Sequence, residues 1–300
     1  MTVLFRGSSG LNTKLDPARI RFNSQSGISD LALAVNVVTD DTGRISRRNG
    51  SARVITGSWH SLHSCGLYGL GVTGDALSVI ESTYATTAIR RVTPNARVSY
   101  ETVRDRTFYV NGFQVGYVED RLSYPWVKPN TYLGIDSTEV WYDPPIGHLV
   151  AYHKGRMLVA KDNVIWISRA QDFFRFNGVC VILPDRIKMI RPVQNGFFVG
   201  TTDETYFLAG EISTTNLQPF QKIRVASYGV AEGTDLAIPG QRVGEGMGNE
   251  IAIWTSYRGV CIGTGDGMFY NLTEKKISLP SAEYGTAVYK DGAYIVLLEP

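Results

Sequence analysis

The stretch His148-Leu-Val-Ala-Tyr-His-Lys-Gly-Arg-Met-Leu-Val-Ala-Lys-Asp-Asn-Val-Ile-Trp-Ile-Ser168 contains three short apolar runs separated by two tight turns. The turns fall at 153–155 and 161–163, and they contain Gly, Asp and Asn, which accept the backbone conformations that tight turns need. Short runs of β-branched and aromatic residues between such turns are typical of antiparallel strands. The stretch therefore predicts a three-stranded meander.

The same plan recurs along the chain. Clear copies span 97–118, 189–208 and 250–272, a partial copy spans 285–298, and a weaker one spans 65–92. Aligned on their first turns, the clear and partial copies lie 49, 41, 63 and 33 residues apart. Degenerate units of roughly 40–50 residues with three or four strands each are the signature of propeller blades. We predict an all-β fold, a β-propeller of about 5–6 degenerate blades, with a sandwich, a barrel or several small β domains as alternatives.

Composition excludes several classes of protein. The 300 residues are 43% hydrophobic and 19% charged, which excludes intrinsic disorder, and a net charge of +2 excludes a chain that is basic or acidic throughout. No stretch approaches the roughly 18 uncharged apolar residues of a membrane-spanning helix, so no membrane insertion is expected. The apolar run at the N-terminus is too short for the core of a signal peptide.

The N-terminal region predicts two further features. Residues 33–48 form a clean hairpin pattern with a turn at 40–43. Because the copy at 285–298 supplies only two strands, and a propeller must pair its first and last strands, we expect this hairpin to complete the terminal blade. Residues 28–38 fit either a short helix or a turn followed by a strand. We therefore divide the chain into an extended N-terminal arm, 1–32, and a β-propeller domain, 33–300.

Residues that could act in catalysis or bind a metal are scattered along the sequence. The three cysteines, Cys65, Cys180 and Cys261, are far apart, odd in number and inside apolar runs, which favours buried free thiols in a reducing cytoplasm. His60 and His63 have metal-ligand spacing only on a helix, and the glycines and serines around them disfavour one. No nucleophile, metal or phosphate-loop motif is complete. We expect no catalytic residues, no metal and no cofactor.

Arginine pairs and triplets stand out in a nearly neutral chain: Arg44, Arg47, Arg48, Arg90 and Arg91. One interpretation is contact with DNA phosphates or with an acidic partner. The alternative is that the charges protect strand edges from pairing with other chains. On a strand, residues 44 and 48 share one face and residue 47 takes the other, so at most two of these three cations line a given surface.

The opening of the chain carries a more specific pattern. A loop with Asp16-Pro17 leads to Leu33-Ala-Val-Asn-Val37 and then to Asp40-Asp-Thr-Gly-Arg-Ile-Ser-Arg-Arg-Asn-Gly50. This order resembles the start of β-propeller virion proteins of bacteriophages, similar to the tail nozzle and packaged-DNA stabilisation proteins of short-tailed phages. In that group, a hairpin with Gly, Ile or Leu, Arg and Gly at fixed spacing follows the loop. Here it is Gly43-x-Ile45-x-x-Arg48-x-Gly50. The resemblance covers about 40 residues well, and elsewhere only the blade pattern agrees.

The resemblance implies a structural role in the tail or neck of the virion, after assembly in the host cytoplasm. The chain is then one subunit of a homo-oligomeric ring, with six subunits as the expected number. The ring stacks on adaptor or portal-side and tail proteins, surrounds the DNA channel, retains the packaged genome and takes part in genome ejection. We expect the isolated chain to be a monomer or a weak oligomer. The residues expected to dock the arm are Asn12, Lys14, Asp16, Pro17 and Arg19.

Two other functions remain open at this point. A glycan-binding or glycan-processing propeller needs inward carboxylates and aromatic platforms, which the five tryptophans supply only if they are not core residues. They are Trp59, Trp126, Trp141, Trp166 and Trp254. A cytoplasmic protein-interaction propeller is the other alternative.

Overall fold

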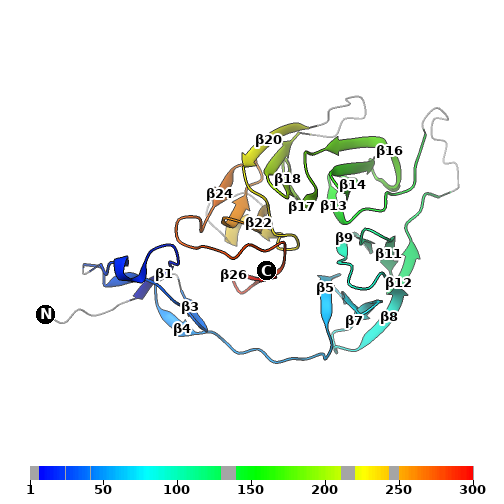
Figure 1. Ribbon diagram of the computed structural model, residues 1–300. Helices are drawn as coiled ribbons and strands as arrows, with labels where there is room; N and C mark the ends of the chain where they lie inside the picture. Colours follow the sequence, from blue (N-terminus) through cyan, green and yellow to red (C-terminus); the bar gives the residue numbers. More distant parts are fainter. Residues whose placement is uncertain are drawn as a thin grey trace.

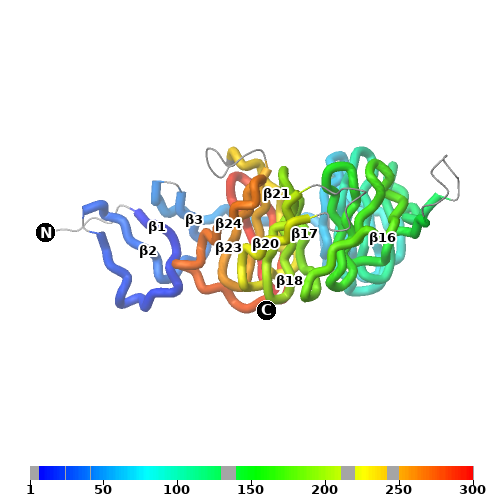
Figure 2. The backbone as a smooth tube through the Cα atoms, turned by 90° about the horizontal axis from the view of Figure 1, so that it is seen from above, coloured from blue at the N-terminus to red at the C-terminus, as the bar shows by residue number. Residues whose placement is uncertain are grey.

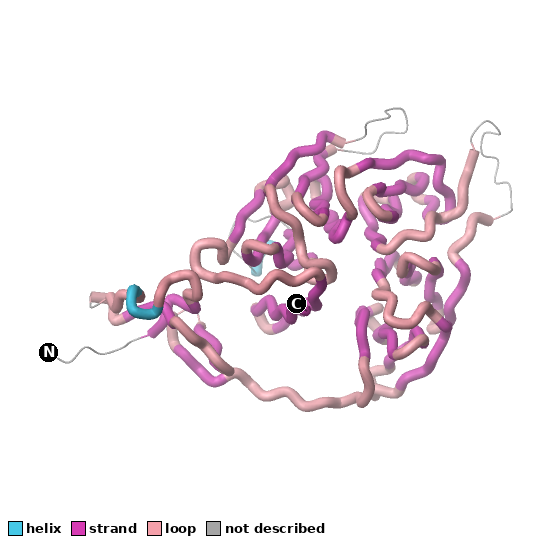
Figure 3. The backbone as a smooth tube through the Cα atoms, in the orientation of Figure 1, coloured by secondary structure: helices cyan, strands magenta, loops and turns pink. Residues whose placement is uncertain are grey.

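The computed structural model describes residues 7–23, 25–40, 42–129, 140–210, 220–242 and 250–299. Strands dominate it, and the described helices are two single 3-10 turns, η1 (Pro17–Arg19) and η2 (Gly240–Arg242). Figure 1 shows a succession of small sheets arranged around a common centre, with β1 to β4 on one side of the ring. Figure 3 shows how little of the chain is helical. The expectation of an all-β, propeller-like fold is confirmed.

Five sheets have four strands each, and each strand pairs antiparallel with the next strand along the chain. Sheet 1 consists of β5 (Trp59–Ser64), β6 (Gly69–Thr73), β7 (Ala76–Ile80) and β8 (Thr86–Arg91). Sheet 2 consists of β9 (Ser99–Val103), β10 (Arg106–Val110), β11 (Val115–Glu119) and β12 (Leu122–Pro125). Sheet 3 consists of β13 (Leu149–His153), β14 (Arg156–Lys161), β15 (Val164–Arg169) and β16 (Asp172–Ile182).

The remaining sheets follow the same order. Sheet 4 consists of β17 (Ile187–Val193), β18 (Gly196–Thr201), β19 (Thr205–Ala209) and β20 (Gln221–Ala226). Sheet 5 consists of β21 (Leu236–Pro239), β22 (Glu250–Ser256), β23 (Gly259–Gly263) and β24 (Phe269–Asn271). Sheet 6 has two described strands, β25 (Tyr284–Lys290) and β26 (Ala293–Glu299).

The first strand of every sheet lies innermost, and these strands begin at residues 59, 99, 149, 187, 236 and 284. The intervals are therefore 40, 50, 38, 49 and 48 residues, which is more regular than the sequence suggests. The copy predicted at 250–272 corresponds to β22, β23 and β24, so it misses the inner strand of sheet 5. Its turn near 258 joins the second and third strands, and this shift produces the uneven sequence spacings of 63 and 33.

The sheets pack face to face because both of their faces are apolar. Successive residues of a strand point to opposite faces, so Phe197 and Val199 of β18 pack against sheet 3, whereas Phe198 between them packs against sheet 5. Such two-sided strands form continuous apolar runs rather than alternating ones. Each sheet therefore needs a neighbour on both sides.

Residues 7–31 form a small unit instead of the extended arm that the sequence predicts. β1 (Gly7–Leu11) and β2 (Ile28–Leu31) pair in parallel, and η1 lies between them. Gly7 packs against the backbone of Gly43, where an added Cβ would lie 2.5 Å from the carbonyl oxygen, so glycine is required. Figure 2 shows this unit beyond β23 and β24, at one end of the molecule.

The predicted N-terminal hairpin is present as β3 (Val37–Thr39) and β4 (Ile45–Arg47). Its turn is stabilised by Asp40, whose carboxylate accepts hydrogen bonds from the backbone N–H groups of Thr42 and Arg44, both at 2.9 Å. Residues 28–38 contain strands and no helix, so the second of the two alternatives holds. Within the described chain the hairpin forms a two-stranded sheet of its own, and its pairing with the terminal sheet stays a prediction.

Replacing Phe197 with Ala tests the packing between sheets. Phe197 is completely buried, and its ring meets Phe220 edge-on at 4.8 Å between centroids. We expect the free energy of unfolding, measured by urea denaturation, to fall by about 3–5 kcal/mol. Phe113→Ala is the matched control because Phe113 is 64% exposed, and its effect should stay within about 0.5 kcal/mol. Equal losses in the two variants would contradict the packing described.

Candidate functional site

The six inner strands surround a central cavity of about 240 Å³. Its lining includes residues from β5, β9, β13, β17 and β25, together with the segment that leads into β21. The contribution of every sheet to one cavity establishes that the sheets are arranged around a common axis. A cavity of this size lies below the usual range for pockets that bind drug-sized ligands.

The cavity contains an internal ion pair. Arg191 of β17 donates from Nε to the Asp235 carboxylate at 2.9 Å and from Nη2 to the backbone carbonyl of the same residue at 3.2 Å. Glu101 of β9 lies nearby, and burial raises the pKa of its carboxyl to about 7, although the charge of Arg191 opposes that shift. The charges of the Arg191 guanidinium and the Asp235 carboxylate therefore neutralise each other inside the cavity.

Histidines near the cavity have structural roles. The Nε2 atom of His63 lies 2.8 Å from Oγ1 of Thr102, and its ring stacks on Tyr100 with centroids 5.2 Å apart. Burial, and then the charge of Arg191, lower the pKa of His63 to about 4, so the ring is neutral at pH 7. In the part of the chain that the structure describes, no three His, Cys, Asp or Glu side chains converge as metal ligands. None of its helices has the length and apolarity to cross a membrane.

The five predicted contact arginines lie on two different elements. Arg44, Arg47 and Arg48 are exposed in and beside β4, whereas Arg90 and Arg91 lie on β8, the outermost strand of sheet 1. None of them lines the central cavity as the structure describes it. The three hairpin arginines therefore form a local exposed group, and the β8 pair is a separate feature.

The predicted docking residues all fall in the 7–31 unit. Lys14, Asp16, Pro17 and Arg19 are exposed. Asn12 is buried instead, because its amide oxygen accepts hydrogen bonds from two backbone N–H groups and its amide nitrogen donates to a carboxylate. Asp16 caps η1 by accepting from a backbone N–H at 2.8 Å. Asn12 and Asp16 thus shape the unit, and its exposed cations are Lys14, Arg19 and Arg21, the last of which the sequence analysis did not single out.

The arm unit is fastened to the segment that follows β24. Lys276 donates from Nζ to the Asp30 carboxylate at 2.9 Å, and the backbone N–H of Thr13 donates to the carbonyl of Lys276 at 2.8 Å. The backbone N–H of Ser278 donates to Oγ1 of Thr13 at 2.9 Å. Hydrogen bonds from Ser9, then Asn12 and Lys276, hold the pKa of Asp30 at about 2. The arm is therefore tied to the connection between sheets 5 and 6.

Five buried clusters fill five of the junctions between neighbouring sheets, from sheets 1 and 2 through to sheets 5 and 6. At the last of these, Tyr289 and Tyr294 of sheet 6 pack on the isoleucines of sheet 5, and the Tyr294 hydroxyl donates to the carbonyl of Thr234 at 2.6 Å. The described residues form no such cluster between sheet 6 and sheet 1. The ring is thus apolar and packed at five junctions and open at the sixth.

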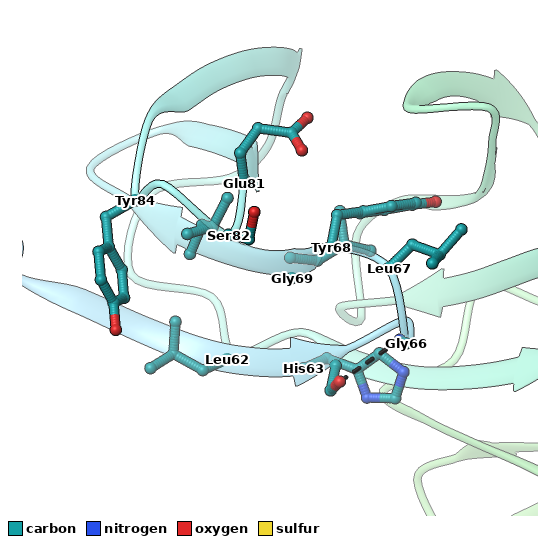
Figure 4. A pocket seen from close by; sticks show the side chains of 12 residues that line it. Leu62, His63, Gly66, Leu67, Tyr68, Gly69, Glu81, Ser82 and Tyr84 are labelled. Atoms are coloured by element: carbon teal, nitrogen blue, oxygen red, sulfur yellow. Dashed lines mark hydrogen bonds between the residues drawn. The ribbon is translucent and has the colours of Figure 1, made fainter.

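Both walls of the open junction are apolar and exposed. On sheet 6, Val288 and Ile295 pair across the strands, with Leu297 two residues further along β26, and these side chains are 52%, 46% and 69% exposed. On sheet 1, Leu62 is 66% exposed and lies on the face opposite to the one that packs on sheet 2. A shallow hollow of about 430 Å³, bordered by Leu62 and Tyr84, lies beside this sheet (Figure 4).

A single bridge spans the inner end of this junction. Arg97, in the connection between β8 and β9, donates to the carbonyl of Gly285 at 3.0 Å and lies 5.3 Å above the ring of Tyr284. No pattern in the sequence indicates this contact, because Arg97 stands alone between two strands. The open junction does have one indication in the sequence, because the copy at 285–298 supplies two strands whereas the clear copies supply three.

No model of a known protein family matches the chain, and neither does any curated protein sequence. Among solved structures, BBS1N in complex with ARL6DN has a TM-score of 0.50 and 11% identity, with coverage of 88% of this chain and 86% of that chain. PorZ of Porphyromonas gingivalis, a surface component of the type-IX secretion system, has a TM-score of 0.41 and 14% identity over 82% of this chain. The N-terminal domain of Nup159 has a TM-score of 0.43 and 9% identity, with coverage of 79% and 71%.

The matched region spans 30% of the PorZ chain. At 11% identity, the likeness to BBS1N concerns the fold alone. It agrees with the succession of four-stranded antiparallel sheets described above. The comparisons therefore support an all-β, propeller-like fold and carry no function over to this chain.

The raised pKa of Glu101 gives the fold a pH dependence. Between its ordinary value of 4.5 and about 7, the folded chain binds a proton that the unfolded chain releases. The contribution of this group is fully present below pH 4.5 and is lost as the pH rises through about 7. We expect Glu101→Gln to flatten the fall in unfolding free energy between pH 5 and pH 7.5, measured by urea denaturation. Glu81→Gln, which removes a carboxylate on the outer side of sheet 1, controls for the lost charge, and an unaltered slope in Glu101→Gln would contradict the assignment.

Proposed function

We propose that this chain is a structural subunit of a ring in the tail or neck of a bacteriophage virion. The observation that carries the proposal is the position of the region that resembles such virion proteins. That region, about 10–50, lies outside the ring of sheets, where it exposes three arginines of the hairpin and three cations of the arm. A propeller-like body with an attached polar extension suits assembly better than catalysis.

The chemistry of the described residues favours a non-enzymatic role. Of the tryptophans considered as glycan platforms, Trp126 and Trp254 are completely buried in the clusters between sheets, and Trp166 packs against one of them. The carboxylate of Asp235 is paired with Arg191. These arrangements weaken the alternative of a glycan-binding or glycan-processing protein. An interaction role remains, and the resemblance makes the virion the favoured setting.

In the proposed assembly, the subunits form a homo-oligomeric ring that contacts adaptor or portal-side proteins on one side and tail proteins on the other. The cavity inside one subunit, about 240 Å³, is too small for duplex DNA. The DNA would therefore pass through a channel enclosed by several subunits. The ring would retain the packaged genome and release it during ejection, and this role requires rigidity rather than a reaction.

The proposal includes a six-bladed propeller. Sheets 1 to 5 each have four strands and would be complete blades, whereas sheet 6 has two strands among the described residues. A hairpin added to β26 would bring sheet 6 to four strands and cover the open junction. The N-terminal hairpin, 37–47, is the segment proposed to do so, as the sequence predicts.

Deletion of residues 2–25 tests the role of the arm. The arm is fastened mainly by exposed hydrogen bonds and one ion pair, which contribute little to folding. We expect the melting temperature to fall by only a few degrees, while incorporation of the chain into virions is lost. Incorporation is measured against the full chain carrying the same tag. Incorporation at the full level would place docking elsewhere, and a loss of folding would show that the arm belongs to the core.

Replacement of Arg44, Arg47 and Arg48 by Gln tests contact with DNA. Each phosphate contact that is lost should reduce the slope of log affinity against log salt by about 0.9. Because the strand places the three side chains on two faces, we expect a loss of one or two contacts. Arg121→Gln is the matched control, since Arg121 already pairs with Glu81 at 2.7 Å. A slope unchanged in the triple variant would favour the role of these charges as protection for a strand edge.

A further inference from the structure

A pocket of about 410 Å³ lies beside β16, the outermost strand of sheet 3. Figure 1 shows β16 on the outer side of the ring, away from the central cavity. Unlike the central cavity, this pocket has a volume within the usual range for small-molecule sites. It is called the aromatic pocket below, and its lining consists of Tyr142, Asp143, Pro145, Trp166, Phe176 and Gly178. Three aromatic rings and one carboxylate therefore share one pocket.

Strand pairing brings the three rings to one face of sheet 3. Tyr142 and Phe176 form an antiparallel bridge, in which the N–H of Tyr142 donates to the carbonyl of Phe176 at 2.7 Å and the N–H of Phe176 donates back at 3.2 Å. Phe176 also pairs with Ser168 of β15, and Trp166 lies two residues before Ser168. Residues directly opposite each other, and residues two apart on a strand, point to the same face. The rings of Tyr142, Phe176 and Trp166 are therefore neighbours.

A bulge in β16 makes room between the rings. Between the pairs that Phe176 and Cys180 make with β15, β15 advances by two residues and β16 by four. Gly178 lies in this bulge with a φ of +85°, and a Cβ added to it would meet no atom within 4 Å. A bulge bends the strand that contains it, and bulges recur beside functional sites. Because Phe176 is 2% exposed and Tyr142 is 56% exposed, the pocket has a buried floor and an exposed wall.

The aromatic pocket carries a negative charge. Oδ1 of Asp143 accepts a hydrogen bond from the backbone N–H of Lys128 at 2.8 Å, which fixes the direction of the carboxylate. The ammonium group of Lys128 donates instead to the carbonyl of Trp141 at 2.8 Å, and the guanidinium of Arg169 lies 5.4 Å from the centre of the Trp141 ring. Neither of these cations belongs to the lining of the pocket. Since the faces of aromatic rings are also electronegative, the whole lining favours a positive ligand.

We propose that the aromatic pocket binds a small molecule with a quaternary ammonium group, such as choline. The methyl groups of such a cation contact the ring faces, and the carboxylate of Asp143 neutralises its charge. A sugar fits less well, because the lining offers the hydroxyl groups of a sugar only Asp143, the Tyr142 hydroxyl and the Trp166 N–H as polar side-chain partners. A purely apolar ligand would leave the carboxylate without a partner. This site goes beyond the proposed role in a ring and does not depend on it.

Calorimetric titration of the full chain with choline tests the proposal. The neutral probe 3,3-dimethylbutanol has the shape of choline without its charge. We expect choline to bind saturably and at least tenfold more tightly than 3,3-dimethylbutanol. Methyl glucoside tests the alternative of a sugar site. The absence of choline binding, equal affinities for the charged and neutral probes, or tighter binding of the glucoside would each overturn the proposal.

Two variants locate the binding of choline. Asp143→Asn removes the charge and keeps an oxygen that accepts from the N–H of Lys128, whereas Tyr142→Ala removes one exposed ring. Each should weaken choline binding at least fivefold, and Tyr142→Phe, which retains the ring, should bind as the unaltered chain does. The matched controls are Asp203→Asn, at an exposed carboxylate of sheet 4, and Tyr84→Ala, at a ring that is 54% exposed. If Asp143→Asn and Tyr142→Ala bind choline as tightly as these controls, the proposal is wrong.

The same variants distinguish a free ligand from a lipid headgroup. Retention of the chain on phosphatidylcholine vesicles but not on phosphatidylglycerol vesicles, with loss in Asp143→Asn, would support the site and identify the headgroup as the source of the ammonium group. Binding of choline without retention on vesicles would support a free ligand. Incorporation into virions reports separately on the proposed function, and Asp143→Asn should leave it unchanged.

Discussion

The sheets of the ring carry apolar side chains on both faces, and the rest of the structure follows from the need to cover both. Phe197 and Phe198, adjacent in β18, are completely buried on opposite sides of one sheet. Removing a face of this kind from water is the main source of stability for the fold, at roughly 25 cal/mol per Å². A row of such sheets leaves two uncovered faces at its ends, and bending the row into a ring brings those faces together. The ring of sheets is the result of that constraint.

By the same constraint, the junction between sheets 6 and 1 differs from the others, because apolar side chains remain uncovered there. Five junctions hold buried clusters, and Arg97 fastens the inner end of the sixth, but its outer part presents exposed leucine, isoleucine and valine side chains on both walls. Exposed apolar surface of this extent in a folded chain marks a site of association. In the central cavity Arg191 is paired with Asp235, whereas the Tyr100 hydroxyl and Oε2 of Glu232 are buried and have no hydrogen-bond partner among the described residues.

The N-terminal region differs from the ring of sheets both in its position and in the polar character of its contacts. The arm is fastened through Asp30 and Lys276, and the hairpin is joined to the arm through Ser8 and Gly43. These contacts are few, polar and partly exposed, in contrast to the apolar clusters between sheets. A unit attached in this way adds little to the stability of the ring of sheets.

The sequence by itself determined the strands, the turns and the recurrence of the sheets. Turn residues and apolar runs act locally, so the meanders around residues 105, 154 and 195 and the hairpins at 37–47 and 284–299 were predictable. The inner strand of sheet 5 was not predicted from the sequence, because it is short and lies far from the next strand along the chain. Only the tertiary structure decided which face of each strand meets which neighbour, that Asn12 is buried, that the arm folds onto the segment around Lys276, and that one junction remains open. Those features depend on contacts between separate segments of the chain, from 18 positions apart for Asn12 and Asp30 to 246 for Asp30 and Lys276, and a local pattern carries little information about such contacts.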